Sequence, residues 1–341
     1  MLVIFGLLGL MIAAMLSAVS MGAADISPIS IVKMMLNKMA FFDLNSTWLP
    51  SDEAIVFHIR LPRVVAGALV GASLATAGVL FQGLLRNPMA DPYIIGTAAG
   101  AGLGATLAMM LPFSAALYGF GLVPIAAFFG ALASVLLVYN LARVGGKTPI
   151  ISMLLAGFAV SAMLAAAISL IMALSGRFQV DLRAVLSFLM GSVSVTDWQQ
   201  IAIIAPLVIA GIVAAMFFAL HLNAFSLGEE GAAYLGIDVE REKLIILALG
   251  SLLTAVAISL GGLIGFVGLV MPHAVRLVLG PEHRLLLPAS ALAGAAFLVV
   301  ADTLARTVLA PTEIPVGIIT ALIGAPFFLY LLRRTRREYA F

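Results

Sequence analysis

The sequence predicts an all-α polytopic membrane protein with about ten transmembrane helices, and two observations carry this prediction. Apolar residues make up 63% of the 341 residues and charged residues only 10%, against about a half and about a quarter in an ordinary soluble domain. A soluble protein of this composition would expose large apolar patches, and a disordered chain requires low hydrophobicity. The apolar residues also occur in runs of about 20, the helix length that crosses a bilayer. Soluble globular and disordered folds are therefore excluded.

Ten apolar runs are candidate spans. The first, 2–21, lacks a basic start and is longer than the apolar core of a signal peptide, so we interpret it as a span, with a signal peptide as the alternative. Two other runs almost touch at Gly261 and Gly262 and are divided because together they are too long for one span. The ten candidate spans are 2–21, 63–82, 94–111, 119–140, 149–174, 199–220, 244–262, 264–279, 286–305 and 315–332.

The segments between the spans are short, so residues 1–341 are predicted to form a single transmembrane domain. The longest segment, 22–62, has about 40 residues, fewer than most independent domains contain. An amphipathic stretch at about 180–190 is too short to span and is predicted to be a short outer helix. A mechanism that needs nucleotide hydrolysis would therefore have to recruit another chain.

Residue patterns argue against several classes of site. The chain has no cysteine, and its four histidines show no metal-ligand spacing, so no metal site is predicted. No stretch combines many Lys and Arg with aromatic residues, which argues against nucleic-acid binding. Residues Gly145 to Thr148 resemble the end of a phosphate-binding loop, but Leu141 stands where that loop requires glycine. We interpret them as an inner turn and expect no cofactor on this chain.

The distribution of positive charge predicts the orientation in the membrane. Eleven of the 18 Lys and Arg residues fall in segments on the same side as the two termini, and seven fall on the opposite side. Positive residues favour the cytoplasmic side, and the run from Arg333 to Arg337 is the clearest part of this bias. With ten spans, both termini are predicted to be cytoplasmic.

Glycines recur at four-residue spacing in two of the predicted spans. Examples are Gly67 with Gly71, and Gly96 with Gly100 and Gly104. On a helix this spacing places small residues on one face, where two backbones can approach closely within a membrane. Ordinary packing of the bundle explains the pattern, and a bundle whose helices must shift is the alternative.

Two stretches carry a more specific signal. The first contains Arg60-Leu61-Pro62-Arg63, Gly67, Gly71, Ala75, Gly78, Gln82, Asn87-Pro88-Met89-Ala90-Asp91-Pro92 and Ile95-Gly96. The second contains Gly265-Phe266-Val267-Gly268-Leu269-Val270-Met271-Pro272-His273, Arg276, His283-Arg284, Pro288, Ala301-Asp302, Arg306, Glu313, Pro315-Val316-Gly317 and Gly324-Ala325-Pro326. Together they resemble the FecCD-type permeases of ATP-binding-cassette (ABC) importers, from about residue 55 to 332. Met89 replaces the usual Leu and Thr97 a frequent Ser, which are small departures.

The resemblance implies a function, a set of partners and a location. Permeases of this family form the membrane pathway for iron–siderophore complexes, haem or cobalamin and perform no covalent chemistry. It implies a second permease subunit, with a homodimer expected, two ABC ATPase subunits that carry ATP and Mg²⁺, and a periplasmic or lipid-anchored substrate-binding protein. It also implies the cytoplasmic (inner) membrane of a bacterium or archaeon. Siderophore, haem and cobalamin stay open as cargo, with an iron complex preferred.

The resemblance also assigns docking and gating residues. Arg60, Arg63 and Arg306 fall at the outer ends of the second and ninth spans, where arginines of the family receive acidic residues of the binding protein. A guanidinium can hold a carboxylate through two hydrogen bonds; anchoring of helix ends at lipid headgroups is the alternative. The inner end of the fifth span is a candidate gate, with Thr148 and Ser152 as its residues, and a plain lipid-facing or bundle-core role is the alternative there.

The inner segment 222–243 resembles the coupling loop of the family, two short helices that sit in a groove of the ATPase subunit. Gly228 and Gly236 are expected to bound a short helix. Leu227, Ala232 and Leu235 are expected to form a small apolar contact face. A plain solvated loop is the alternative. The residues assigned to this contact are Leu227, Gly228, Ala232, Leu235 and Gly236.

An ion-coupled secondary transporter is the alternative function. Such a carrier would need acidic residues near mid-span, where a charge costs about 2.5–3.5 kcal/mol and usually marks an ion path. The main charged candidates inside the predicted spans, Asp302 and Arg276, lie toward span ends. Uptake driven by an ion gradient without an ATPase subunit would identify this alternative.

Overall fold

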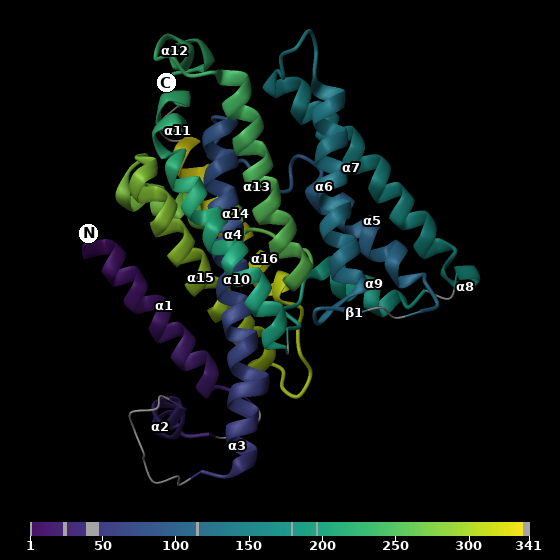
Figure 1. Ribbon diagram of the computed structural model, residues 1–341, viewed down its shortest axis with the longest axis vertical. Helices are drawn as coiled ribbons and strands as arrows, with labels where there is room; N and C mark the ends of the chain where they lie inside the picture. Colours follow the sequence, from purple (N-terminus) through teal and green to yellow (C-terminus); the bar gives the residue numbers. More distant parts are fainter. Residues whose placement is uncertain are drawn as a thin grey trace.

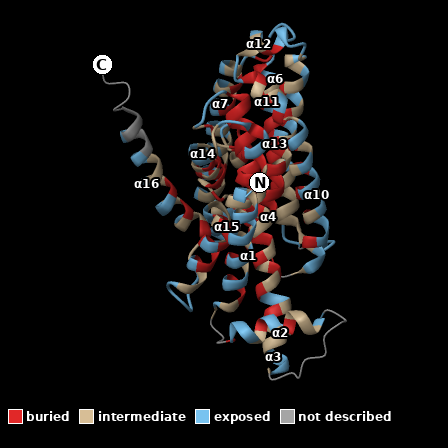
Figure 2. Ribbon diagram, turned by 90° about the vertical axis from the view of Figure 1, so that its left-hand side faces the viewer, coloured by how far each residue is buried: buried red, intermediate tan, exposed pale blue. Residues whose placement is uncertain are grey.

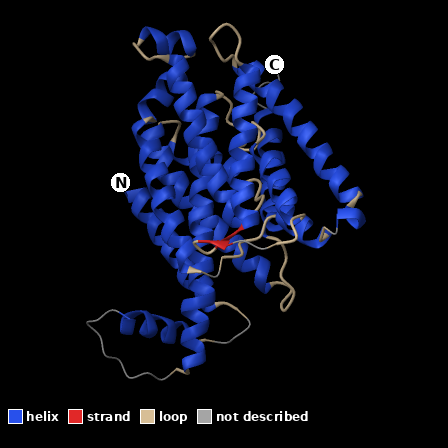
Figure 3. Cartoon of the chain, turned by 45° about the vertical axis from the view of Figure 1, so that its right-hand side comes forward, coloured by secondary structure: helices blue, strands red, loops and turns tan. Residues whose placement is uncertain are grey.

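Apolar helices form most of the part of the chain that the structure describes, in agreement with the predicted fold class (Figure 3). The computed structural model describes residues 2–22, 26–38, 48–113, 116–178, 180–195 and 197–336, so Arg337 of the predicted basic run lies outside the described residues. Two short strands, β1 (Ala116–Leu117) and β2 (Phe120–Gly121), pair antiparallel. The helices are α1 (Leu2–Ser20), α2 (Pro28–Lys38), α3 (Pro50–Ile55), the π-helical turn η1 (Val56–Arg60), α4 (Leu61–Leu84), α5 (Thr97–Met109), α6 (Leu122–Ala142), α7 (Ile150–Ala173), α8 (Ser175–Phe178), α9 (Leu182–Met190), α10 (Trp198–Phe217), α11 (Ala219–Phe225), α12 (Glu229–Tyr234), α13 (Val239–Gly261), α14 (Val267–Leu279), α15 (His283–Thr307) and α16 (Val316–Arg336).

Each predicted span corresponds to an apolar helix. Within the described ranges, seven helical segments are long and apolar enough to cross a membrane: Leu2–Ser20, Pro50–Leu84, Leu122–Ala142, Ile150–Ala173, Trp198–Phe217, Val239–Gly261 and His283–Thr307. Three further apolar helices are shorter: Thr97–Met109, Val267–Leu279 and Val316–Tyr330. These helices confirm a multi-pass membrane protein with about ten apolar helices.

The second helical segment is longer than predicted. α3, η1 and α4 form one helical run of 35 residues, Pro50–Leu84, where the sequence predicted a span over 63–82. The added part carries Asp52 and Glu53. These polar residues argue against burial in hydrocarbon, but they do not oppose a helix that continues into water. Hydropathy therefore located the span and missed the helical extension.

α4 is the buried centre of the bundle. Most residues of α4 are buried, whereas α1 is largely exposed (Figure 2). α7 is also largely exposed. α4 packs along α13, α14 and α15. The packing is close because glycines face each other: a Cβ at Gly71 would overlap the backbone carbonyl of Gly294, and one at Gly78 would overlap that of Gly268. The two sequence stretches that carry the family motifs thus meet along α4.

The predicted division at Gly261 and Gly262 is confirmed. α13 ends at Gly261, and Gly262 has a φ of 64°, which a residue with a side chain rarely adopts. The chain that follows is held by α9, because the backbone N–H of Leu263 donates to the carbonyl oxygen of Phe188 at 3.1 Å. α14 then starts at Val267. The two apolar runs are therefore separate helices joined by a short hydrogen-bonded segment.

The candidate site residues lie at opposite ends of the molecule. Figure 1 shows α12 at one end of the long axis and α2 and α3 at the other. The end of α15 lies near the end of α1, which leads into α2. The predicted coupling loop and the predicted docking arginines are therefore separated by the full length of the bundle.

Candidate functional site

At the end of the molecule near α2, Arg63 links α4 to two acidic residues of distant segments. Its Nε and Nη2 donate to the carboxylate of Asp302 at 3.0–3.2 Å. Its Nη1 donates to both oxygens of Glu313 at 2.9 and 3.1 Å. Asp302 is almost fully buried, and Glu313 is about half exposed, with 52% of its side chain accessible. One guanidinium therefore bridges a buried and an exposed carboxylate.

Arg60 and Arg306 donate hydrogen bonds to backbone carbonyl oxygens at the C-terminal end of α1. Arg60 Nη1 donates to the backbone oxygens of Val19 and Ser20 at 2.9 and 3.1 Å. Arg306 Nη1 donates to the backbone oxygen of Met21 at 3.0 Å, and its Nη2 donates to the backbone oxygen of Ala18 in the last turn of α1. The last carbonyls of a helix lack partners within the helix, so these guanidiniums act as its C-terminal cap.

The structure thus brings the three predicted docking arginines together, but in an arrangement that the sequence did not predict. Arg60 is buried, and Arg306 also lies 3.6 Å from Asp302. The arginines were expected to be exposed charges or headgroup anchors, and they instead bind carbonyls and carboxylates of this chain. The sequence interpretation missed Asp302 as the shared partner of Arg63 and Arg306, although its spacing of four from Arg306 on one helix was a usable signal. A docking role for the three arginines stays a prediction.

At the opposite end, α12 forms a short exposed helix between two glycines. Gly228 and Gly236 both have positive φ, 97° and 84°, and they bound the helix as predicted. Leu227 and Leu235 are exposed, with 68% and 63% of their surface accessible. Tyr234, which the sequence interpretation missed, is 91% exposed beside Leu235.

Ala232 does not belong to the exposed face of α12, which corrects the sequence interpretation. Ala232 is fully buried and packs in the same apolar cluster as Leu222 and Phe225. A helix of six residues is too short for its apolar periodicity to show which side faces the bundle. The exposed apolar surface is therefore made by Leu227, Tyr234 and Leu235.

The candidate gate lies after a tight turn at this same end. Val144 and Lys147 exchange two backbone hydrogen bonds across Gly145 and Gly146, which both have positive φ, as a two-residue hairpin turn requires. The predicted turn is therefore present. Thr148, which follows it, is buried.

The backbone of Thr148 is held by side chains of α13. Its N–H donates to Glu240 at 2.9 Å, and its carbonyl oxygen accepts from Lys243 at 3.0 Å. Ser152 is half-buried in the first turn of α7. The structure fixes where these residues lie, and their role as a gate stays a prediction.

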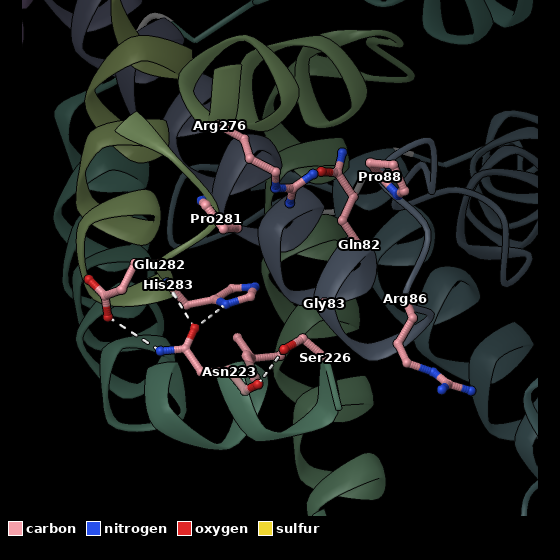
Figure 4. Close-up of a pocket in the computed structure, with 11 residues that line it drawn as sticks. Gln82, Gly83, Arg86, Pro88, Asn223, Ser226, Arg276, Pro281, Glu282 and His283 are labelled. Carbon is pink, nitrogen blue, oxygen red and sulfur yellow. Dashed lines mark hydrogen bonds between the residues drawn. The ribbon is translucent and has the colours of Figure 1, made fainter. Parts of the chain in front are cut away.

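A cavity of about 510 Å³ is lined by residues of α11 and by residues at the ends of α4 and α14 (Figure 4). Asn223 of α11 spans one side of it: its side-chain oxygen lies 2.6 Å from Nδ1 of His283, and its amide donates to Glu282 at 3.3 Å. These contacts attach the coupling segment to the start of α15. Arg276 and Gln82 line the opposite wall.

The loop between α4 and α5 contains the family motif residues Asn87 to Pro92. Burial raises the pKa of Asp91 to about 6, and the backbone N–H of Tyr93, which donates to its carboxylate at 2.8 Å, opposes that rise. The Tyr93 hydroxyl donates to Ile264 O at 2.9 Å, and burial raises the pKa of this phenol. The loop is therefore tied to the segment that joins α13 to α14.

In the part of the chain that the structure describes, no group of three His, Asp or Glu side chains could hold a metal ion.

Comparison with known proteins identifies the family. The sequence profile of the FecCD transport family matches residues 10–334. The chain belongs to this family. The cobalamin import system permease protein BtuC of Halobacterium salinarum is 50% identical over 281 residues, which cover 82% of this chain and 74% of that protein. The hemin transport system permease protein HmuU of Yersinia pestis is 40% identical, over 85% of this chain and 88% of that protein.

Two further proteins extend the comparison. The Fe(3+)-citrate import system permease protein YfmD of Bacillus subtilis is 38% identical over 93% of this chain and 90% of that protein. A solved structure of a protein assigned to the metal-chelate type ABC transporters, in an inward-facing conformation, matches with a TM-score of 0.80 and 29% identity over 97% of this chain and 98% of that chain. This FecCD protein is therefore a permease subunit of an ABC importer, and an ion-coupled carrier is not favoured.

Proposed function

We propose that this FecCD permease forms the translocation pathway for a metal chelate and is driven by ATPase subunits that bind α12. One observation carries the proposal: Tyr234 and Leu235 at the end of the glycine-bounded helix α12, and Leu227 just before it, are exposed to solvent at one end of the bundle, opposite the arginine cluster. Large apolar side chains exposed together on a protein surface are typical of a protein contact. ATP and Mg²⁺ would reside on the ATPase subunits, with no cofactor on this chain.

The assembly would contain a second permease subunit, with a homodimer as our preferred composition. Support comes from α7, which is apolar along its length and largely exposed in the single chain, with Ile151, Leu155 and Phe158 on its accessible surface. A two-fold pair would place two such surfaces around one pathway. We place the assembly in the cytoplasmic membrane, with α12 and both termini on the cytoplasmic side.

The binding protein would dock at the end that carries Arg60, Arg63 and Arg306. Arg63 supports this most directly, because one of its two carboxylate partners, Glu313, is half exposed. An acidic residue of the binding protein could share that guanidinium. Such charge pairs favour the rate and register of docking more than its affinity.

The cargo would be one of the chelates that the relatives are named for. Among the cobalamin, hemin and Fe(3+)-citrate permeases described above, the cobalamin permease has the highest identity to this chain. This favours cobalamin over the iron complex that we preferred from the sequence. The proposal is tested in proteoliposomes that contain the permease, the ATPase subunit and the binding protein, with cyanocobalamin, haemin and ferric citrate as probes. Uptake of one probe should require both ATP and the ATPase subunit. Uptake driven by an ion gradient alone would contradict the proposal.

A further inference from the structure

Lys243 connects three segments at the α12 end of the molecule. It lies near the start of α13 and is buried, with 6% of its surface accessible. Its Nζ lies 2.6 Å from Glu240 and 3.2 Å from Glu229, and it donates to the carbonyl oxygen of Thr148 at 3.0 Å. An ammonium group has three N–H donors. Two hydrogen bonds and one close ion pair thus give this ammonium a partner on α12, on α13 and on the segment before α7.

The same cluster holds both backbone groups of Thr148. Lys243 binds its carbonyl oxygen and Glu240 accepts from its N–H. Thr148 stands two residues before α7, and the turn before it is closed by the hydrogen bonds between Val144 and Lys147. A shift of the Lys243 side chain would therefore move the backbone that leads into α7.

The third arm of the cluster reaches α12. Glu229 is the first residue of α12, and its side chain is 36% exposed, against 7% for that of Lys243. A cavity of about 280 Å³ lies among Glu229, Lys243 and the first residues of α7. Because side chains do not fill this space, α12 and the turn have room to move relative to each other.

We propose that Lys243 is a positioning residue that transmits displacement of α12 to the inner end of α7. The inference rests on the proposed function, because it takes α12 as the helix that the ATPase subunit moves. Adjacency alone does not establish such a connection; a change at one end must alter the other. Glu229→Gln is the first substitution to test, because it weakens the contact between Lys243 and α12 and leaves the Lys243–Glu240 pair and both contacts to Thr148 intact.

The test uses the complex of permease and ATPase subunits and a single introduced thiol. The natural chain has no cysteine, and Ile151, in the first turn of α7, is 73% exposed, so Ile151→Cys gives one reactive site on the permease. The rate of its reaction with a maleimide is measured without nucleotide and after trapping with ATP and vanadate. We expect ATP to change this rate about fivefold, the lower end of typical coupling between sites.

In Glu229→Gln, the change with ATP should fall below about twofold while the ATPase subunit still co-purifies and hydrolyses ATP. Glu230→Gln, an exposed carboxylate at the next position of α12, is the matched control and should keep the full change. If Glu229→Gln releases the ATPase subunit, the same measurement is made in Lys243→Gln, whose substitution lies outside α12.

Two results would overturn the inference: a full response to ATP in the Glu229 or Lys243 variant, or an equal loss of response in Glu230→Gln. Failure of the unsubstituted permease to co-purify with any ATPase subunit is a different outcome, because it would remove the proposed function itself.

Discussion

At the arginine end, Asp302 supplies the buried negative charge. Its carboxylate accepts from Arg63 and lies 3.6 Å from Arg306, and only 3% of its side chain is exposed. Two guanidiniums that also serve other segments thus depend on one anion. A buried ion pair adds little compared with an apolar pair, but loss of one partner leaves an uncompensated charge.

Asp302→Asn should therefore destabilise the protein by about 3–5 kcal/mol, the usual effect of breaking a buried pair. The measurement is thermal unfolding of the purified permease in detergent. Glu313→Gln is the control: Glu313 binds the same arginine but is half exposed, so its loss should amount to at most about 1 kcal/mol. Equal losses in the two variants would show that burial does not set the strength of this cluster.

Asp91 gives a prediction for pH dependence. Burial raises its pKa from the ordinary 3.8 to about 6, so between these values the folded state binds more protons than the unfolded state. Stability from this residue is then present at low pH, is lost as pH rises through about 6, and changes no further above it. Asp91→Asn keeps an acceptor for the Tyr93 N–H and removes the charge.

The Asp91→Asn variant should match the natural protein in stability near pH 4 and exceed it near pH 7 by no more than about 3 kcal/mol. Unfolding temperatures of both proteins measured across this range give the difference curve. A difference that is the same at all pH values would mean that the carboxylate is not perturbed by burial.

At the scale of helices, close packing explains why some glycines of α4 are needed and others are not. The sequence placed Gly67 and Gly71 on one face at four-residue spacing and could not rank them. In the structure a Cβ at Gly71 would overlap the backbone of Gly294, whereas one at Gly67 would make an ordinary contact of 3.9 Å with Val299. Spacing along one helix does not reveal where the partner helix crosses it.

Gly71→Ala should consequently destabilise the permease by about 1–3 kcal/mol, because α4 and α15 must separate to admit the methyl group. Gly67→Ala should be neutral or stabilise by up to about 1 kcal/mol, since alanine favours the helix. The amount of permease that remains monodisperse after heating in detergent reports both effects. Similar behaviour of the two variants would contradict the close contact between α4 and α15.

The coupling helix gives a second prediction at this scale. Leu235→Asp should release the ATPase subunit and leave the bundle inserted, because Leu235 is exposed and contributes little to the core. Co-purification of the ATPase subunit with tagged permease measures the effect. Leu309, an exposed leucine just after α15, is the control, and Leu309→Asp should leave co-purification unchanged. Normal binding by Leu235→Asp would remove α12 from the interface.

For the whole molecule, the sequence predicted the number and order of the apolar helices because each must satisfy its backbone inside hydrocarbon. It could not predict features that depend on contacts between distant segments. Arg60 and Arg63 meet Arg306 because α4 and α15 pack side by side. Ala232 turned inward for a similar reason, since its neighbours in α11 and not its own sequence decide which side of α12 is covered.

The proposed assembly requires that the α12 end and the arginine end lie on opposite sides of the membrane. Since the chain has no cysteine, Tyr234→Cys on α12 and Leu309→Cys after α15 each introduce one exposed thiol. A maleimide that cannot cross membranes should label position 309 and not 234 in right-side-out vesicles, and the reverse in inverted vesicles. Both positions should react after detergent lysis, which controls for thiol reactivity. Labelling of both positions from the same side would mean that an even number of spans lies between them. The binding protein and the ATPase subunit could then not act at opposite ends of one pathway.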